Sequence, residues 1–296
     1  MSIPALLLPD FLLILAGAML YRQTDWGAGF WAGLEKLVYF VLFPALLFNA
    51  SSHAPIDLNN SGRLLASVLL ATAAGVLLGW LARPLLRAGP MMFESAVQTA
   101  FRFNSYIALA LASRLGGEAA TALVALLIAF AVPMCNMAAV HALAHSKGGL
   151  GLALLKNPLL VATVSGIGCN LAGVYLPEFV NATLSRLGNA SIALGLITVG
   201  AGLKLSGARD GKALAAWFIG VKLLALPAIV YGIGRWLGLP PLHLQLAVMF
   251  CALPTASSAY VLAARMGGDG PFVAFVVSAG TVISALTLPL WLLLVS

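Results

Sequence analysis

Charged residues are scarce in this sequence. They make up 8% of its 296 residues, whereas 61% of the residues are hydrophobic. A soluble globular domain carries about 25% charged residues, and a chain of this length could not bury so much apolar surface in one water-soluble core. A lipid bilayer solvates such a surface instead. The composition therefore predicts an all-α polytopic membrane protein and excludes a soluble globular domain.

Cysteine is also rare, and its spacing carries no metal or disulfide signature. Cys135, Cys169 and Cys251 all fall inside apolar segments without a C-x-x-C spacing. Neither a disulfide framework nor a zinc site is therefore expected. The four histidines do not cluster either, so no metal site and no pair of nucleophile and base follows from them. We expect no cofactor and no enzymatic activity.

Acidic residues are absent from the middle of every apolar segment. A cation–proton antiporter normally needs an intramembrane carboxylate to carry the proton. This distribution favours organic-anion transport over cation–proton exchange, although both remain open. The net charge of +7 comes from basic residues scattered at segment ends, without a stripe of interleaved aromatics. That pattern does not indicate binding of nucleic acid.

Ten apolar segments follow one another along the chain, and each suits a membrane span of about 20 residues. The breaks between them carry glycine, proline or charge, and we read Gly27 to Gly33 as one such break. No room remains for a soluble domain, so residues 1–296 are predicted to form a single membrane domain. The segments cover about residues 5–22, 35–51, 62–82, 92–113, 119–143, 152–174, 185–206, 212–236, 243–265 and 271–295.

Lysine and arginine in the short loops predict the orientation. With the N-terminus outside, ten basic residues face the cytoplasm and four face out, and the opposite orientation would invert this bias. Both termini are therefore expected on the extracytoplasmic side of the cytoplasmic (inner) membrane. Two basic residues belong to no loop: Arg102 lies midway in the fourth segment and Lys222 midway in the eighth.

An internal repeat divides the chain into two halves. The stretch RFNSYIALALASRLGGE, which begins at Arg102, aligns without gaps with LPTASSAYVLAARMGGD, which begins at Leu253. The first lies on segment four and the second on segment nine, so the halves, about 1–145 and 152–296, hold five segments each. Because five is odd, the second half enters the membrane inverted. Such inverted repeats are typical of secondary transporters.

Substrate sites in such folds form where helices are broken near the middle of the bilayer. Pro254 removes a backbone donor in segment nine, and hydroxyl groups follow it. The matching place in segment four holds Asn104. If both helices unwind and cross there, two half-helix N-termini point inward and suit a carboxylate. The candidate substrate-binding residues are Asn104, Arg102, Ser105, Tyr106, Pro254, Thr255, Ser257, Ser258, Asn49 and Lys222.

Two readings stay open for the charged candidates. Arg102 either snorkels into a cytoplasmic cavity or provides the counter-charge for an anionic substrate. Lys222 is open to the same two readings, and snorkelling is easier for a lysine. Asn49 is a helix-borne amide, and such amides serve more often in interhelical contacts than as ligand groups. Pro254 could likewise be a simple kink.

Several stretches resemble the auxin efflux carrier family, including its bacterial permeases. They are KNPLLVATVSGIGCNLAGVYLPEFVNATLSRLGNASIALGLITVGAGL from Lys156, LEKLVYFVLFPALLFNASS from Leu34, and the segment from Leu253. The resemblance covers essentially the whole chain. It implies ten helices in two inverted repeats, with broken helices four and nine crossing at the substrate site at Asn104, Pro254 and Thr255.

The same resemblance implies a static scaffold of helices one, two, six and seven. The remaining helices form a transport part, which predicts an elevator-type alternating-access mechanism. It also implies a homodimer and carboxylate substrates, such as auxin-like acids or small dicarboxylates. This sequence departs from the plant pattern, because segment four lacks a proline before Asn104 and the loop after segment five is short. Sodium or proton coupling stays open, as does a cation antiporter or sodium-coupled symporter with the same plan.

Overall fold

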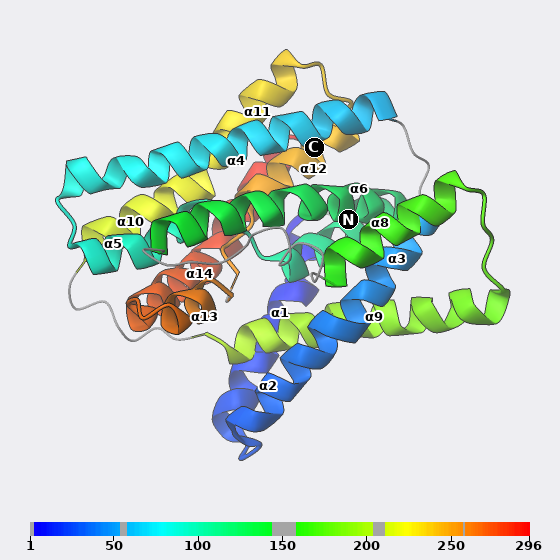
Figure 1. The fold of residues 1–296 in the computed structure, drawn as a ribbon, viewed down its shortest axis with the longest axis horizontal. Helices are drawn as coiled ribbons and strands as arrows, with labels where there is room; N and C mark the ends of the chain where they lie inside the picture. Colours follow the sequence, from blue (N-terminus) through cyan, green and yellow to red (C-terminus); the bar gives the residue numbers. More distant parts are fainter. Residues whose placement is uncertain (1–2, 54–57, 144–157, 204–210, 257) are drawn as a thin grey trace. The chain divides into compact units, whose positions relative to one another are not determined.

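The computed structural model describes residues 3–53, 58–143, 158–203, 211–256 and 258–296. Throughout these ranges the regular secondary structure is helical, and none of them contains a strand (Figure 1). The expectation of an all-α membrane protein is confirmed at this level. Six of the described helical stretches are long and apolar enough to cross a membrane: Gly27–His53, Ser61–Leu86, Pro90–Leu143, Glu178–Ala201, Lys212–Trp236 and Gly270–Leu294. The ten-helix inverted arrangement stays a prediction.

The helices follow the predicted segments closely in order and position. They are α1 (Ile3–Gln23), α2 (Gly27–Leu37), η1 (Val38–Leu42), α3 (Phe43–His53), α4 (Leu58–Leu86), α5 (Pro90–Ala96), η2 (Val97–Ala100), α6 (Ser105–Leu143), α8 (Pro158–Leu171), α9 (Glu178–Ala201), α10 (Lys212–Gly220), η3 (Val221–Ala225), α11 (Leu226–Trp236), α12 (Pro241–Ala252), α13 (Ser258–Arg265) and α14 (Gly270–Leu294). Of the short η elements, η2 is a 3-10 helix, and η1 and η3 are π-helical turns.

The chain divides into two compact units, each built from three separate stretches. Unit 1 comprises Met1–Asp57, Leu109–Ala129 and Gly149–Gly202. Unit 2 comprises Leu58–Ala108, Phe130–Gly148 and Leu203–Ser296. Unit 1 contains α1, α2, α3, α8 and α9, which belong to the segments that the resemblance assigns to a scaffold. The stretch Leu109–Ala129 of α6 is an addition that the resemblance does not imply.

In unit 1, glycines allow helix backbones to approach closely. α1 packs on α9, and α3 packs on both α8 and α9. A Cβ atom added at Gly200 would overlap the backbone of Ile14, and one added at Gly17 would overlap the backbone of Ile197. Small residues at such crossings are typical of membrane helices, because apolar lipid offers no hydrophobic drive for helix association.

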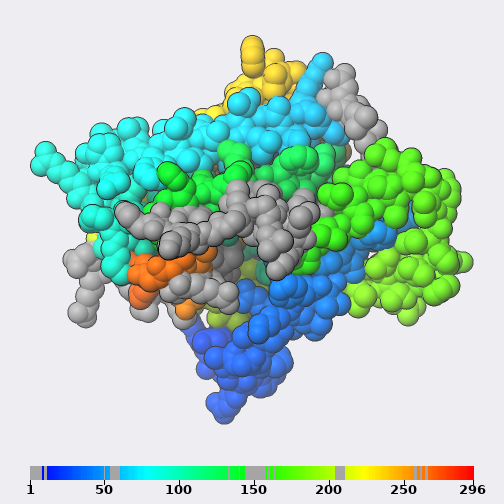
Figure 2. Space-filling view, viewed as in Figure 1, coloured from blue at the N-terminus to red at the C-terminus, as the bar shows by residue number. Residues whose placement is uncertain are grey.

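In unit 2, the long helix α4 packs along α10, α11 and α12. Its Gly75 faces the side chain of Leu226, and its Gly79 faces Val97 and Ala100 of η2. This G-x-x-x-G pair therefore serves close packing within the chain. Along one face of the molecule α4 is open to its surroundings (Figure 2). Its exposed large hydrophobic side chains, which suit contact with lipid, are Leu70, Leu77, Leu81 and Leu85.

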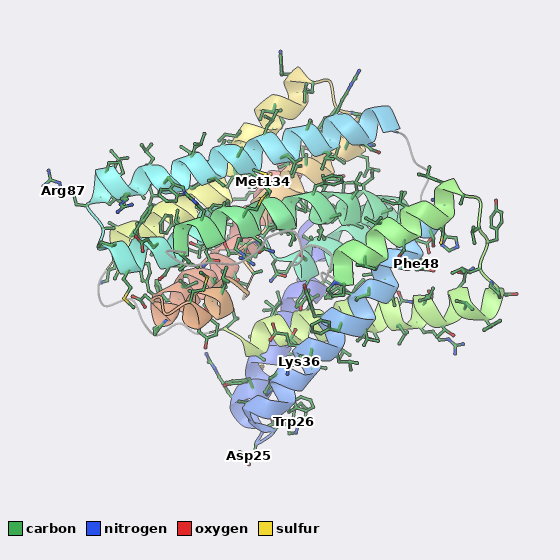
Figure 3. The ribbon with its side chains drawn as sticks, in the orientation of Figure 1. Asp25, Trp26, Lys36, Phe48, Arg87 and Met134 are labelled. Atoms are coloured by element: carbon green, nitrogen blue, oxygen red, sulfur yellow. The ribbon has the colours of Figure 1, made fainter. Side chains whose placement is uncertain are left out.

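The predicted break at Gly27 to Gly33 is wrong. α2 begins at Gly27, directly after the short turn that carries Asp25 and Trp26 (Figure 3). Three aromatic rings pack there: Trp26 lies against Phe30 with 4.8 Å between ring centroids, and Phe30 lies against Trp31 at 5.3 Å. The spacing of Trp26 and Phe30 brings two rings onto one helix face. Their packing outweighs the low helix propensity of the glycines.

Two glycines divide α6, as the sequence predicted. Gly116 (φ −154°, ψ 23°) and Gly117 (φ 59°, ψ −142°) leave the helical region, so two helices meet there at a kink. The positive φ of Gly117 is a conformation that residues with a Cβ atom rarely adopt. The predicted boundary between the fourth and fifth segments therefore lies where the glycines were found.

A proline shapes the wide turn η3. Pro227 lacks an N–H group, so the carbonyl of Leu223, four residues earlier, loses its intrahelical donor. The indole Nε1 of Trp291 donates to this carbonyl at 2.9 Å. The freed backbone group is thus satisfied from α14, and the irregular turn is held in place. η3 carries Lys222, one of the predicted site residues.

Candidate functional site

The first helix break lies between η2 and α6. Residues 102–104 are not helical, and the helix α6 begins at Ser105. The side-chain Oδ1 of Asn104 accepts from the backbone N–H of Tyr106 at 2.9 Å and of Ile107 at 3.3 Å. Asn104 is therefore the N-cap of α6, a role that asparagine fills well. Both bonds use Oδ1, and neither uses the Nδ2 amino group.

The second break follows α12. Leu253 is extended (φ −61°, ψ 144°), and the chain regains helical structure only at Ser258. Pro254 lies in this break and is buried. Because proline has no N–H group, it cannot continue the hydrogen-bond ladder of α12. Of the two readings left open for Pro254, a kink or an unwound segment, the structure shows an unwound stretch at residues 253–256.

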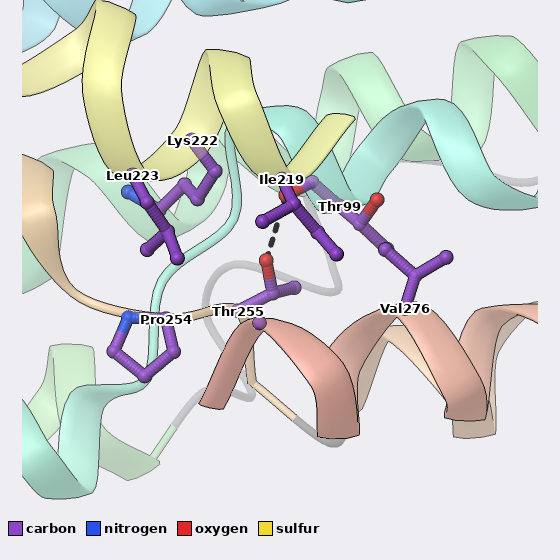
Figure 4. Close-up of a pocket in the computed structure, with 8 residues that line it drawn as sticks. Thr99, Ile219, Lys222, Leu223, Pro254, Thr255 and Val276 are labelled. Carbon is purple, nitrogen blue, oxygen red and sulfur yellow. Dashed lines mark hydrogen bonds between the residues drawn. The ribbon is translucent and has the colours of Figure 1, made fainter. Parts of the chain in front are cut away.

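The two breaks cross and bond directly to one another. The backbone N–H of Asn104 donates to the carbonyl of Pro254 at 2.8 Å. The hydroxyl of Thr255 donates to the carbonyl of Thr99 at 2.7 Å, as the dashed line in Figure 4 marks. The first break thus supplies the Asn104 donor, η2 directly before it supplies the Thr99 acceptor, and the second break supplies both the Pro254 acceptor and the Thr255 donor. Residues about 150 positions apart in sequence thus meet at one point within unit 2.

Lys222 reaches this crossing from η3. Its side chain is only 3% exposed, and its Nζ donates to the carbonyl of Cys251 at 2.8 Å. Cys251 belongs to the last turn of α12, where carbonyl groups lack intrahelical donors. The ammonium group therefore meets the end of a helix that carries about half a negative charge. A lysine in this position stabilises the broken end of α12.

A small cavity lies between these groups. It is lined by Thr99, Ile219, Lys222, Leu223, Pro254, Thr255, Val276 and Gly280 (Figure 4). Its volume of about 10 Å³ holds roughly one water molecule. Three of the predicted residues, Lys222, Pro254 and Thr255, share this cavity. A carboxylate does not fit in it without a movement of the surrounding helices.

Arg102 is half-buried in the first break, next to the crossing. Its guanidinium donates to the side-chain Oε1 of Gln98 at 3.3 Å. Gln98 in turn donates through Nε2 to the carbonyl of Ser95 at 2.9 Å and of Ala259 at 3.2 Å. Arg102 and Lys222 both belong to unit 2.

Comparison with known proteins decides the family. A family profile described as "Membrane transport protein" matches residues 141–292, which is just over half of the chain. The chain belongs to this family. The resemblance to the auxin efflux carriers and their bacterial permeases is thereby confirmed at the level of the family, and a transport function follows from it.

The chain is similar to two described relatives. A protein from Methanothermobacter thermautotrophicus described as "Uncharacterized transporter" is 32% identical over 154 residues, half of this chain and half of that protein. The match thus spans about half the length of this relative. A protein from Rhizobium meliloti described as "Putative malonate transporter" is 24% identical over 282 residues, which are 90% of this chain and 87% of that protein.

The remaining predicted residues of this membrane transport protein lie in several places. Ser105 and Tyr106 form the first turn of α6, and both are half-buried. Asn49 lies on α3 in unit 1, where its backbone carbonyl accepts from the hydroxyl of Ser52 at 3.0 Å. Ser257 lies outside the described residues, and only the backbone of Ser258 is described, as the start of α13.

Thr99 and Gln98 are the residues at the crossing that the sequence interpretation missed. Thr99 contributes a carbonyl group, which no side-chain pattern reveals. Gln98 is fully buried and connects η2 with α13 and with Arg102. The available signal was the pair of polar residues in mid-segment, four and three positions before Arg102.

Among the described residues, no group of three or more His, Cys, Asp or Glu side chains is placed to hold a metal ion. The polar groups at the crossing are amide, hydroxyl, ammonium, guanidinium and backbone groups. Most of them donate hydrogen bonds, and two of them carry positive charge. The chemistry of this donor set suits a small anion.

Proposed function

We propose that this chain is a secondary transporter of a small organic anion, with its substrate site at the crossing of the two helix breaks. The observation that carries the proposal is the meeting of Asn104, Pro254 and Thr255 with the buried ammonium group of Lys222. A positive charge in an apolar membrane segment needs a partner or a purpose. A carboxylate substrate supplies that partner, and a dicarboxylate such as malonate, which the name of one relative mentions, suits two cations.

The proposed architecture has ten membrane spans in two inverted five-helix repeats, about 1–145 and 152–296. Its support is the position of the breaks, at residues 102–104 in the fourth span and at 253–256 in the ninth. Half-helix ends at such breaks are the binding elements of inverted-repeat transporters. The cavity is too small for a carboxylate, so binding requires a conformational change, as alternating access does.

The proposed mechanism is of the elevator type, in which a transport part moves against a static scaffold. Its support is the division of the chain into two compact units whose helices follow the predicted grouping, apart from Leu109–Ala129. A homodimer would fix the scaffold in the membrane. We place the protein in the cytoplasmic membrane with both termini outside, because the loop lysines and arginines favour this orientation.

A second candidate function is cation-coupled exchange or symport on the same plan. The specific observation in its favour is the set of backbone carbonyls at the crossing, because unwound carbonyls and half-helix C-termini coordinate coupling ions in other transporters. Sodium dependence of substrate binding separates this candidate from an uncoupled anion carrier.

The proposal is tested through the charge of Arg102. Arg102→Ala should weaken binding of malonate more than binding of its monomethyl ester, which carries one negative charge fewer. A screened charge pair in partly shielded surroundings contributes about 1–2 kcal/mol, or roughly 5- to 30-fold in affinity. The measurement is binding of both ligands to the purified wild type and variant, in low salt and in physiological salt.

Arg235→Ala is the matched control, because Arg235 is an exposed arginine near the end of α11. It should leave the affinity for both ligands unchanged. Equal affinities of Arg102→Ala and wild type for malonate would show that Arg102 only snorkels to water. If the wild type binds no carboxylate at all, the proposed function itself is refuted.

A further inference from the structure

The ammonium group of Lys222 lies at the C-terminal end of the broken helix α12. Its hydrogen-bond acceptor, the Cys251 carbonyl, belongs to the last turn of α12, directly before the second break. The last four carbonyls of a helix have no intrahelical donor, and the helix dipole makes this end negative. In transporters with broken helices, such half-helix C-termini and unwound carbonyls coordinate the coupling cation.

The other acceptors at the crossing are already used by donors of the chain. The carbonyl of Pro254 accepts from the backbone of Asn104, and the carbonyl of Thr99 accepts from the hydroxyl of Thr255. The Cys251 carbonyl accepts from Lys222. Each of these carbonyls therefore has a donor from this protein in place of a bound ion.

The turn that carries the lysine is bonded to a neighbouring helix. It lies in the π-helical turn η3, and such turns are frequent at functional sites. The next carbonyl, that of Leu223, is bonded to the indole of Trp291 in α14. The side chain of Lys222 lines the cavity beside Pro254 and Thr255. None of the described residues lining this cavity carries a carboxylate.

We infer that Lys222 is a tethered cation: its ammonium group occupies the cation position at the end of α12 and makes anion binding at the crossing independent of sodium. The inference rests on the proposed substrate site and deepens it, because it assigns the coupling behaviour of that site to one residue. A covalently attached charge never leaves with the substrate. The anion is then carried without a bound cation.

The first test needs no anion. In Lys222→Ala the atoms beyond Cβ are removed, and they match propylammonium in size and charge. Propylammonium should raise the Tm of this variant by about 2 °C or more, because a ligand that binds only the folded state stabilises it. Tetraethylammonium, which is too large, should not. The wild type should respond to neither ion, nor to replacement of sodium by choline at equal ionic strength.

The second test measures malonate binding in the same solutions. Wild-type affinity should be the same in sodium and in choline. Lys222→Ala should bind at least about ten-fold more weakly, a loss of about 1.4 kcal/mol. Propylammonium should restore most of this affinity. Lys212→Ala, which removes an exposed lysine at the start of α10, is the matched control and should behave as wild type.

The outcomes separate the two claims. Sodium-dependent malonate binding by the wild type overturns the inference and leaves the anion site standing. A Lys222→Ala variant that binds malonate in choline with the wild-type affinity likewise overturns the inference and leaves the anion site standing. If no carboxylate binds, the proposed function fails, and the Tm response to propylammonium still decides whether Lys222 fills a cation position. Should Lys222→Ala not fold, Lys222→Met, which keeps the apolar stem, should show the same loss of malonate affinity in choline.

Discussion

Asn104 combines two chemical groups with different tasks. Its Oδ1 accepts from two backbone N–H groups and caps α6, so half of the side chain is structural. The Nδ2 group takes no part in these bonds, and in the proposed site it is the donor for the anion. A substitution that removes both groups at once cannot tell these tasks apart, whereas isosteric substitutions can.

Asn104→Asp should keep the cap and repel the substrate. A carboxylate oxygen caps a helix as well as an amide oxygen does, so the Tm should stay near that of the wild type. Its negative charge replaces a donor, so the affinity for malonate should fall by about ten-fold or more. Thermal unfolding and ligand binding are measured on the same preparation.

Asn104→Ala is the variant with which Asn104→Asp is compared. It removes the cap and should reduce the free energy of unfolding by about 0.5–2 kcal/mol. It should also lower the affinity for mono- and dicarboxylates alike, because it removes a hydrogen bond and no charge. An Asn104→Asp variant that binds malonate as the wild type does would place the anion away from Asn104.

At the residue scale, the sequence predicted which side chains gather but not how they are used. Pro254, Asn104 and Lys222 stand out in mid-segment because proline, amide and charge are rare in lipid-facing helices. That Oδ1 of Asn104 turns back to cap its own helix depends on local backbone geometry. The partner of Thr255 is a carbonyl, and every residue carries one, so no sequence pattern marks Thr99 as that partner.

At the element scale, the contact of α1 with α9 depends on glycine. A Cβ atom on Gly200 would overlap backbone atoms of Ile14 and Ala18, which cannot move aside as the end of a side chain can. Gly200→Ala should therefore destabilise the protein by about 1–3 kcal/mol, as overpacking does in other cores. Its Tm, measured in detergent, should fall accordingly.

Gly29→Ala is the matched control within the same unit. A Cβ atom at Gly29 has no neighbour within 4 Å. Alanine has the higher helix propensity by about 1 kcal/mol, so the Tm of this variant should stay level or rise. Equal Tm values for Gly200→Ala and Gly29→Ala would contradict the close contact of α1 with α9.

Segment positions were largely predictable because apolar length and glycine-rich breaks dominate the sequence. The π-helical turns and the 3-10 helix η2 were not. The turn η3, for example, depends on a tertiary contact: Pro227 leaves the Leu223 carbonyl without its helical donor, and Trp291, 68 positions after Leu223, donates to it. The early start of α2 was missed for a related reason, since ring packing among Trp26, Phe30 and Trp31 overrides glycine.

At the scale of the whole molecule, the inverted repeat makes a prediction about sidedness. Glu118, just after the kink in α6, aligns with Asp269 of the second half, and Pro271, at the start of α14, lies two residues after Asp269. Glu118 and Pro271 are both exposed. Glu118→Cys should react with an impermeant thiol reagent from the extracytoplasmic side and Pro271→Cys from the cytoplasmic side. The background should lack the three native cysteines.

Right-side-out and inside-out vesicles provide the two directions of access. Reaction of both cysteines from the same side would refute the inverted repeat. Pro271 is preferable to Gly268 for this purpose, because a side chain at Gly268 would collide with the hydroxyl of Ser95. The repeat stays a prediction from the matching segment numbers, whereas the grouping of Leu109–Ala129 with unit 1 depends on contacts that no periodicity encodes.

The bond from the Asn104 amide to the Pro254 carbonyl uses only main-chain atoms. It is therefore available to almost any amino acid at either position; only proline at 104 lacks the donor. Side chains around the crossing can therefore be replaced without loss of this bond. If the proposed anion site is correct, its substrate preference can change through side-chain substitutions that leave the main-chain connection intact.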